Sequence, residues 1–530
     1  MGAWLLQAVV LWLGFQGLQN AQAAGPLPLR TPGEMGMSRA RLEELAELIA
    51  PEIKAENLPG CVVAIGRTGG LVYLRAFGER QQEPTSEAMT IDTVFDMASV
   101  TKPVATATSV MHLVERGKLR LRDPVADYLP DFGTHGKEAI TIEHLLTHQG
   151  GLIPDNPLAD YADGARMAWE RIYALSPQVE PGTEFIYTDV GFLTLGRVVQ
   201  QVSGLSVADY ARKYVFSPLG MDETGFVPHA DLRARAAPTE RRDDQWLRGQ
   251  VHDPRAAALG GVAGHAGLFS TADDLAIFCD AMLRGGANAA GRALHPATLL
   301  EMTRPRDIGG ALRGLGWDMR TNYSSNRGET FSARAFGHGG FTGTAVWIDP
   351  QLDLFVIFLS NRLHPDGVGN VNPLAGRIGT VAAAAIESAN PSAGPDWSDQ
   401  VRRPAAISAT PRASSVDAAP APPALLGVDV LRRDRFSALC GKRVGLIVNH
   451  TSRAGDGRRV IDLLHEAPDI DLKVLFSPEH GLFGKLDQSN IDDTRDEATQ
   501  LPVYSLYGES RQPTPEQLKD LDALVFDIQD

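Results

Sequence analysis

Hydrophobic positions recur along the chain with two periods, and the switches between them predict the order of the elements. Residues 38–53 place apolar side chains at helical spacing, whereas residues 61–78 contain two strand-like runs joined by a turn at Thr68-Gly69-Gly70. An apolar run from Val104 to Leu113 predicts a buried helix, and mostly helical patterns continue to about Gly286. A helix and a strand pair are therefore predicted to precede a mostly helical region.

Strand patterns return at residues 336–361 as a hairpin, and an apolar helix over 373–388 follows. Strands from both ends of one region that flank a helical middle predict an α+β fold: an antiparallel sheet with helices on both sides and a helical subdomain. Periodicity then disappears between residues 391 and 424, where seven Pro and nine Ala occur in 34 residues. This composition predicts a semi-extended linker after a first domain at 32–390.

Beyond Leu425, short strand-like and helix-like segments alternate to Asp530, a pattern that predicts a parallel, Rossmann-like α/β domain. The last segment, DALVFDIQD, has the pattern of a buried strand, and no covering element follows it. We therefore expect residues 425–530 to be the truncated part of a larger domain.

The first 23 residues form an apolar run that ends in Ala21-Gln22-Ala23, the small-x-small pattern of a cleavage site. We expect residues 1–23 to be a signal peptide, with a secreted, periplasmic protein and no stable membrane span after cleavage. An uncleaved anchor is the alternative, although the run is shorter than the ~20 residues of a spanning helix.

Composition limits the partners of the protein. A formal net charge of −15 argues against nucleic acid and anionic membrane surfaces, which bind clustered Lys and Arg. Cys61, Cys279 and Cys440 are too few and too far apart for a disulfide framework or a metal cluster, so we expect them to be packing residues. We expect no metal and no other cofactor.

The first chemical signal is Ser99-Val100-Thr101-Lys102, a hydroxyl and an amine one helical turn apart at the start of the buried helix. The pattern is common, and an N-cap Ser followed by a solvated Lys is the structural alternative. A helix N-terminus, however, offers unpaired N–H groups to a developing oxyanion, and the Lys places a potential base beside the hydroxyl. We interpret Ser99 as a candidate nucleophile.

Two later segments complete a constellation. Tyr187-Thr188-Asp189 precedes an amphipathic helix, which places the Tyr on a loop just before its first turn. His338-Gly339-Gly340 opens a strand of the hairpin, where glycines permit close approach to a ligand. In order and spacing, the three segments resemble the S-x-x-K, Y-x-N and K-T-G or H-x-G motifs of serine β-lactamases, penicillin-binding proteins and their esterase relatives.

Flanking segments support this resemblance, which covers residues 32–390: IEHLLTHQGGL, SPLGMDETGF, GGVAGHAGLFSTADDLAIF and GTAVWIDP. The resemblance implies a β-lactamase/transpeptidase-like fold and a serine hydrolase that forms an acyl-enzyme. By the same resemblance, Ser99 would be the nucleophile, Lys102 the base and Tyr187 the proton relay to the leaving group. The N–H groups of Ser99 and Phe341 would hold the oxyanion.

Two positions depart from the family motifs and bear on substrate binding. His338 replaces the Lys of penicillin-processing members, which removes a permanent cation for a substrate carboxylate. Asp189 replaces the Asn, and a carboxylate there favours protonated Lys102, so either Lys102 or Tyr187 could be the base. The carboxylate could also select an amine-bearing substrate. Gly340 and Phe341 complete the substrate-binding set that the resemblance implies.

Two further groups of histidines could carry chemistry. His265 lies with Asp253 in a glycine-rich segment able to approach the rim of the site, where it could bind substrate; hydrogen bonds that fix the loop are the structural alternative. His144 and His148 have the i, i+4 spacing of a zinc pair, but no Glu follows His144, and the segment is scaffold in the family. We expect no metal there.

In the second domain, VNHTS, FSPEHGLFG and PVYSLYGESRQPTPEQL resemble the start of the exo-β-N-acetylmuramidase family, glycosidases that remove terminal N-acetylmuramic acid. Glu479 is the candidate general acid or base, because glycoside hydrolysis uses a positioned pair of carboxyl groups; a strand-end Glu in a turn is the alternative. Because residues 425–530 would cover only the start of such a domain, we expect no glycosidase activity.

A secreted serine hydrolase joined to a muramidase-like domain fits an enzyme that acts on peptidoglycan fragments. The expected reaction is amide hydrolysis of muropeptides in cell-wall recycling, as in relatives that are N-acetylmuramoyl-L-alanine amidases. A carboxylesterase or D-amino-acid peptidase of the same fold is one alternative, and a non-catalytic module that binds cell-wall peptides is another. The presence of Ser99, Lys102 and Tyr187 favours an enzyme.

Overall fold

The computed structural model describes residues 25–367, 369–390, 427–449, 452–477, 493–506 and 512–527. The chain divides into two compact units, Met1–Ala406 and Ile407–Asp530, and each has its own sheet and core. The expected signal peptide at 1–23 and linker at 391–424 lie outside the described residues.

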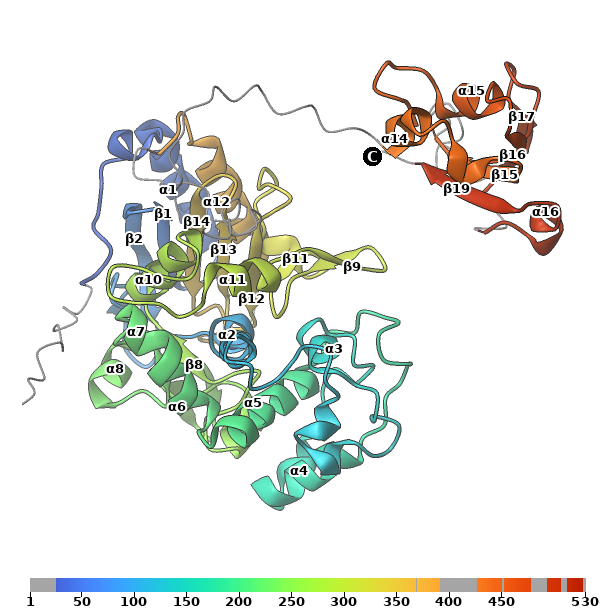
Figure 1. Cartoon of the computed structure of the whole chain (residues 1–530). Helices are drawn as coiled ribbons and strands as arrows, with labels where there is room; N and C mark the ends of the chain where they lie inside the picture. The colour runs from blue at the N-terminus through green and yellow to red at the C-terminus, as the bar shows by residue number, and fades with distance from the viewer. Residues whose placement is uncertain are drawn as a thin grey trace, which may run out of the picture. The chain divides into compact units, whose positions relative to one another are not determined.

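Nine antiparallel strands form the central sheet of the first unit (Figure 1). Their order is β3-β2-β1-β14-β13-β12-β11-β10-β9, so strands from the two ends of the unit meet where β1 pairs with β14. This order confirms the predicted antiparallel sheet, and the predicted turn joins β1 to β2. The strands are β1 Gly60–Arg67, β2 Gly70–Gln81, β3 Glu87–Ala88, β9 Arg306–Ile308, β10 Ala311–Arg313, β11 Asp318–Arg320, β12 Phe336–Gly340, β13 Thr344–Asp349 and β14 Leu354–Ser360.

Helices cover both faces of this sheet, which is why β1 is buried along its whole length. Along β1, Val62 and Ala64 belong to one core cluster, whereas Cys61 and Val63 belong to another. Successive side chains point to opposite faces of a strand, so a continuous apolar run indicates burial on both faces. The helices in contact with the two faces are α1 Arg39–Lys54 and α12 Asn372–Ala384 on one side and α10 Ala272–Leu283 on the other.

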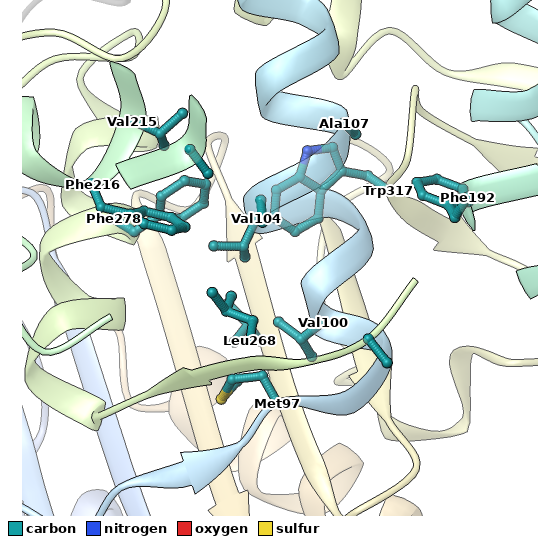
Figure 2. Packing of buried hydrophobic residues seen from close by; sticks show 14 of the residues in the cluster. Met97, Val100, Val104, Ala107, Phe192, Val215, Phe216, Leu268, Phe278 and Trp317 are labelled. Carbon is teal, nitrogen blue, oxygen red and sulfur yellow. The ribbon is translucent and has the colours of Figure 1, made fainter. Parts of the chain in front are cut away.

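The middle of the first unit is mostly helical, as the pattern predicted, and it encloses the segment that follows Ser99. Figure 2 shows Val100 and Val104 in the apolar cluster that also holds Phe278 and Trp317. Two small sheets that the pattern did not predict, β4-β8-β5 and β6-β7, lie in the same part of the chain. The elements are α2 Thr108–Glu115, α3 Ile142–Leu146, α4 Ala165–Ala174, α5 Asp189–Ser203, α6 Val207–Ala211, α7 Ser217–Leu219, α8 Ala230–Arg235, α9 Pro254–Ala258, α11 Pro296–Met302, β4 Phe95–Asp96, β5 Gly225–Phe226, β6 Pro238–Arg242, β7 Gln245–Arg248 and β8 Leu268–Ser270.

The predicted buried helix starts irregularly. A 3-10 turn over Ala98–Val100 (η2) leads into a π-helical stretch over Lys102–Ala107 (η3), and regular α-helix begins only at Thr108. Pro103 explains part of this change, because it has no N–H to donate to the carbonyl of Ser99 in an α-helical hydrogen bond. Within the nucleophile motif, Ser99 therefore lies in a 3-10 turn, which is tighter than an α-helix, and Lys102 begins a π-helical stretch, which is wider.

The second unit is an α/β layer whose five-stranded sheet has the order β17-β18-β16-β15-β19. Its strands pair in parallel except β17, which is antiparallel to β18, so the predicted parallel α/β pattern is confirmed. Glu479 lies outside the described residues. The elements are α14 Gly427–Arg433, β15 Arg443–Val448, α15 Val460–His465, β16 Asp471–Ser477, β17 Thr494–Arg495, β18 Pro502–Ser505, α16 Pro515–Leu518 and β19 Ala523–Asp527.

The three cysteines are free thiols in different environments. Cys61 and Cys279 are buried, as expected of packing residues, whereas Cys440 is exposed. The packing expectation is therefore wrong for Cys440, which directly follows a short 3-10 turn at the surface of the second unit.

Gly196 of α5 and Gly264, the residue before His265, allow these two segments to approach each other closely. A Cβ at Gly264 would lie 2.0 Å from the carbonyl oxygen of Phe192 and 2.9 Å from the nitrogen of Gly196. Both are backbone atoms, so neither can rotate away. The carbonyl of Gly264 also accepts a 2.6 Å hydrogen bond from Thr106, which ties the same segment to η3.

We predict that Gly264→Ala destabilises the first unit by about 1–3 kcal/mol, because the added methyl group overpacks a backbone contact. Chemical denaturation followed by circular dichroism measures the change. Gly225→Ala is the control, because a Cβ there meets nothing within 4 Å. Equal stability of the two variants would show that the α5 contact is looser than the structure indicates.

Candidate active site

Ser99 and Lys102 are in direct contact. Lys102 Nζ donates a 2.8 Å hydrogen bond to Ser99 Oγ and a 3.3 Å bond to the carbonyl of His265. Ser99 is partly exposed, whereas the Lys102 side chain is fully buried. Burial excludes the structural alternative of a solvated lysine. The hydroxyl is thus accessible on one side and in contact with a proton-carrying group on the other.

Asp189 supplies the charge that balances the buried ammonium. Its Oδ1 lies 2.6 Å from Lys102 Nζ, in an ion pair. Burial has the largest single effect and lowers the pKa of Lys102, but the facing carboxylate of Asp189 and the phenol of Tyr187 together outweigh it and raise that pKa. Burial would raise the pKa of Asp189, and the ammonium outweighs it in the opposite direction. Both groups are therefore charged at neutral pH, and Lys102 is not a free base.

Tyr187 lies on the loop before α5, and its ring is close to the ammonium of Lys102. Thr188 is the N-cap of that helix, and its hydroxyl donates a 2.6 Å hydrogen bond to the carbonyl of Ile153. His148 supports the tyrosine: the two ring centres lie 4.5 Å apart, and its Nδ1 accepts the N–H of Thr188 at 3.1 Å. The ammonium of Lys102 lies 4.9 Å from the centre of the Tyr187 ring. Burial raises the pKa of Tyr187, so its phenol is a proton donor at neutral pH.

The hairpin of β12 and β13 is tied to the residues just before Ser99. Thr342 donates a 2.7 Å hydrogen bond to the carbonyl of Asp96, and Thr344 donates a 3.2 Å bond to that of Met97. A Cβ at Gly340 would lie 2.5 Å from the oxygen of Met97, so glycine is required for this approach. The hairpin is therefore held against the strand that leads into the nucleophile.

The backbone at Ala98 is in the left-handed region, with φ of 43°. Its N–H donates a 2.8 Å hydrogen bond to Asp96 Oδ1, which holds this conformation. Strained residues of this kind persist where the surrounding structure fixes them, and they concentrate at functional sites. Phe341 follows Gly340 at the end of β12, and its side chain is 61% exposed. The expected oxyanion partners thus come from two segments that hydrogen bonds hold together.

His338 is neutral and has one defined tautomer. Its Nδ1 lies 2.7 Å from the carbonyl of Gly339, which can only accept, so the proton is on Nδ1. Burial, with the charges of Arg313 and Lys102, holds the pKa of His338 well below its usual range. The buried Nε2 has no hydrogen-bond partner among the described residues and is left as an acceptor. The cation that the family Lys would provide is therefore absent at this position.

His265 lies behind Lys102. Its side chain is fully buried, and Nε2 is 2.9 Å from Asp253 Oδ1, so its position matches the loop-fixing alternative and does not line the pocket at Ser99. Asp189, Asp253 and His265 bring potential metal-ligand atoms within 4.8 Å of one another. In the described structure one of these carboxylates, Asp189, already pairs with the ammonium of Lys102, which also donates to the backbone carbonyl of His265.

A pocket of about 450 Å³ opens at the nucleophile. Ser99 and Tyr187 line it together with His338, Gly340 and Phe341, which are substrate-binding positions expected from the sequence; Asp189 and His265 are not part of its lining. The pocket also contains residues that sequence reasoning missed: Arg313, Asp318, Tyr323, Asn326 and Arg362. Arg313 had one available signal, a lone arginine in the small and apolar stretch GGALRGLGW.

Two family models match the chain. The model described as "Beta-lactamase" matches residues 45–379, and the model described as "Exo-beta-N-acetylmuramidase NamZ, N-terminal" matches residues 444–530. Both resemblances stated from the sequence motifs are thereby confirmed, the first over most of the first unit and the second over the sheet of the second unit.

Among curated proteins, the chain is 30% identical over 403 residues to a protein of Escherichia coli O157:H7 named "Putative D-alanyl-D-alanine carboxypeptidase". The alignment covers 68% of this chain and 92% of that protein. A solved family VIII carboxylesterase has a TM-score of 0.54 at 22% identity, covering 66% of this chain and 99% of that one. A penicillin-binding protein homologue from Caulobacter crescentus has a TM-score of 0.53 at 21% identity with the same coverages, so both share the fold.

We predict that Asp189→Asn changes the pH dependence of kcat/KM. In the wild type, Asp189 keeps Lys102 charged, and the pair does not titrate near neutral pH. Without the carboxylate, burial lowers the pKa of Lys102, so activity should rise with pH as Lys102 loses its proton. At pH 6 we expect a loss of about 100-fold, the usual weight of one acid–base group.

The measurement is kcat/KM on a neutral aryl ester between pH 5 and 10. Asp155→Asn is the matched control, because this carboxylate is closer to solvent and pairs with Arg255 instead of Lys102. An unchanged profile in Asp189→Asn would mean that the ion pair takes no part in proton transfer.

Proposed function

This chain belongs to the β-lactamase family of serine hydrolases, and on that premise we propose that its first unit hydrolyses the amide bond between N-acetylmuramic acid and L-alanine in muropeptides. The observation that carries the proposal is the contact of Ser99 Oγ with a buried ammonium that is itself paired with Asp189. It supplies a nucleophile and a route for its proton. The muramidase-like second unit supports peptidoglycan fragments as the substrate class.

In the proposed acylation, Ser99 Oγ attacks the amide carbonyl carbon. Its proton passes to Lys102 Nζ while Lys102 transfers one of its own protons to Asp189 Oδ1, so Lys102 stays an ammonium and Asp189 becomes a carboxylic acid. The N–H groups of Ser99 and Phe341 hold the oxyanion. When the C–N bond breaks, the amine takes the phenolic proton of Tyr187, and Tyr187 regains a proton from Asp189 through Lys102, which restores the ion pair.

Deacylation uses the same groups in reverse. A water molecule attacks the acyl carbonyl and gives its proton to the Lys102–Asp189 pair, and the carboxylic acid leaves as Ser99 Oγ takes that proton back. A shared pair is advantageous here, because the extra proton that it takes up offsets the negative charge of the oxyanion in the buried site.

A D-amino-acid peptidase is the second candidate. The E. coli relative's name contains D-alanyl-D-alanine carboxypeptidase, which favours cleavage within the peptide of a muropeptide over cleavage at its sugar. Both reactions act on peptidoglycan fragments, and both proceed through an acyl-enzyme on Ser99, with a different acyl group in each. We also propose that the protein is exported, on the strength of the pattern in residues 1–23. Within the described part of the chain, no helix is long and apolar enough to cross a membrane.

We predict that a fluorophosphonate forms one covalent adduct on Ser99. Intact mass should show the added mass in the wild type and its loss in Ser99→Ala, because removal of the nucleophile leaves nothing for the probe to modify. Ser86→Ala, an exposed serine outside the pocket, serves as the control and should label fully. Labelling that survives in Ser99→Ala, or none in the wild type, would favour the non-catalytic binding module.

We further predict that N-acetylmuramoyl-L-alanine peptides are cleaved with a kcat/KM at least about 10-fold above that of peptides ending in D-alanyl-D-alanine. A preference of this size corresponds to about 1.4 kcal/mol in the transition state. Mass spectrometry of the products identifies the bond that is cut. Release of terminal D-alanine without free muramic acid would replace the amidase with the peptidase, and turnover of aryl esters alone would indicate an esterase.

A further inference from the structure

Asp96 is a buried carboxylate that takes no part in the proposed proton transfers. It ends strand β4, three residues before Ser99, and it is only 3% exposed. Its two oxygens accept backbone N–H groups from different segments: Oδ1 from Ala98 at 2.8 Å and Oδ2 from His252 at 2.7 Å. Burial of a carboxylate costs free energy unless such donors replace the lost water. Asp96 therefore ties the residues before Ser99 to the segment that leads into α9.

The contact with Ala98 bears on the first of the two oxyanion donors, the N–H of Ser99. Ala98 has a positive φ of 43°, a conformation that costs free energy for residues other than glycine. The hydrogen bond from its own N–H to Asp96 offsets part of this cost. The N–H of Ser99 belongs to the next peptide unit, so the backbone angles at Ala98 set the direction in which it points. Asp96 therefore controls that direction through Ala98.

Two further contacts connect Asp96 to the second donor, the N–H of Phe341. The carbonyl of Asp96 accepts a 2.7 Å hydrogen bond from the hydroxyl of Thr342, the next residue after Phe341. The ring of His252, whose N–H is held by Asp96, lies 5.5 Å from the Phe341 ring, centre to centre, with 31° between the planes. The guanidinium of Arg362 lies 4.7 Å from the centre of the same ring. Phe341 is thus held through its neighbour in the chain and through its side chain, although it is 61% exposed.

We propose that Asp96 is the positioning residue of the oxyanion hole: its carboxylate and its carbonyl fix the N–H groups of Ser99 and Phe341 relative to each other. The inference rests on the proposed function only in using these two N–H groups as the donors to the oxyanion. It deepens that function, because such donors stabilise the transition state only when both lie about 2.7–3.1 Å from the oxygen that becomes negative. One residue can set that spacing here because it contacts both segments.

The contacts require a carboxylate at this position. An asparagine has one acceptor oxygen, and its NH2 group would face one of the two backbone N–H donors. Asp96→Asn therefore keeps the volume of the side chain and loses one of its two ties. On 4-nitrophenyl acetate we expect kcat/KM to fall about 10- to 100-fold. This is less than the ~100- to 1,000-fold effect of deleting an oxyanion donor, because both N–H groups remain and only their spacing changes.

A second ester separates this effect from a general loss of structure. In O-4-nitrophenyl thionoacetate, sulfur replaces the carbonyl oxygen, and sulfur accepts hydrogen bonds weakly, so this ester gains little from the oxyanion hole. The wild type should therefore release nitrophenol with a higher kcat/KM from the oxygen ester than from the thiono ester. In Asp96→Asn the ratio of the two values should fall about 10-fold or more, because only the oxygen ester depends on the spacing of the donors.

Asp274→Asn is the matched control, because it makes the same change in another buried carboxylate of the first unit. Asp274 is 5% exposed and accepts a 2.9 Å hydrogen bond from the N–H of Glu223 and a 2.7 Å bond from the hydroxyl of Thr224. It does not line the pocket at Ser99, so the ester ratio should keep its wild-type value. A similar fall in both variants, or an unchanged ratio in Asp96→Asn, would overturn the assignment.

A second variant covers the case in which Asp96→Asn fails to fold. Thr342→Val keeps the branched shape of the side chain and removes the hydroxyl that contacts the carbonyl of Asp96. The ester ratio should fall about 3- to 10-fold, the usual effect of one hydrogen bond, and Thr342→Ser should retain it because the hydroxyl is kept. A wild-type ratio in Thr342→Val, or equal rates of the wild type on both esters, contradicts the proposal.

The esters also separate this inference from the proposed amidase. Neither ester contains a muramoyl amide, so the ratio reports only on the oxyanion hole. A fall of the ratio in Asp96→Asn without cleavage of muramoyl amides by the wild type would reject the amidase and keep the role of Asp96. Cleavage of muramoyl amides with an unchanged ratio would keep the amidase and reject that role.

Discussion

The buried ammonium of Lys102 is the constraint on which the active site depends. A lone ammonium without a counter-charge would cost several kcal/mol in a site with no access to water, so the fold has to bring partners to it. One partner, Ser99, is one turn earlier in the chain, and two come from distant segments: the carbonyl of His265 and the carboxylate of Asp189 at the start of α5. Loss of the Asp189 contact would leave the charge unbalanced.

The ion pair of Lys102 and Asp189 also determines how Ser99 can lose its proton. A neutral lysine is the simplest partner for a serine nucleophile, yet Asp189 holds the lysine in its charged form. The proton of Ser99 can then leave only if the pair itself accepts it, which makes the lysine and the carboxylate one functional unit. Hydrogen bonds from Thr342 and Thr344 fix the sheet hairpin against the strand before Ser99, so the nucleophile and its oxyanion partners keep their spacing while the pair exchanges protons.

The charge around Ser99 is divided between two sides. Behind Lys102 lies an anionic cluster that includes Asp189 and Asp253, and on the pocket side the cations Arg313 and Arg362 face one carboxylate. His338, which lines the same pocket, is neutral and contributes an acceptor in place of a cation.

The apolar pattern and the short motifs of the sequence were sufficient to predict much of the fold and several residues of the site. The apolar runs predicted the antiparallel sheet and the parallel second unit, because burial on both faces of a strand leaves a continuous hydrophobic signature. Three short motifs, in order, pointed to Ser99, Lys102 and Tyr187, and the Asn-to-Asp departure at position 189 pointed to a charged lysine. The tertiary structure decided what depends on distant contacts. Pro103 and its neighbours turned a predicted helix into 3-10 and π segments, His265 came to lie behind Lys102, and Arg313 entered the pocket from β10. A single arginine in an apolar stretch carries no sign of its neighbours; only the packed sheet places it in the wall of the pocket, because burial is a property of the fold and not of the local sequence.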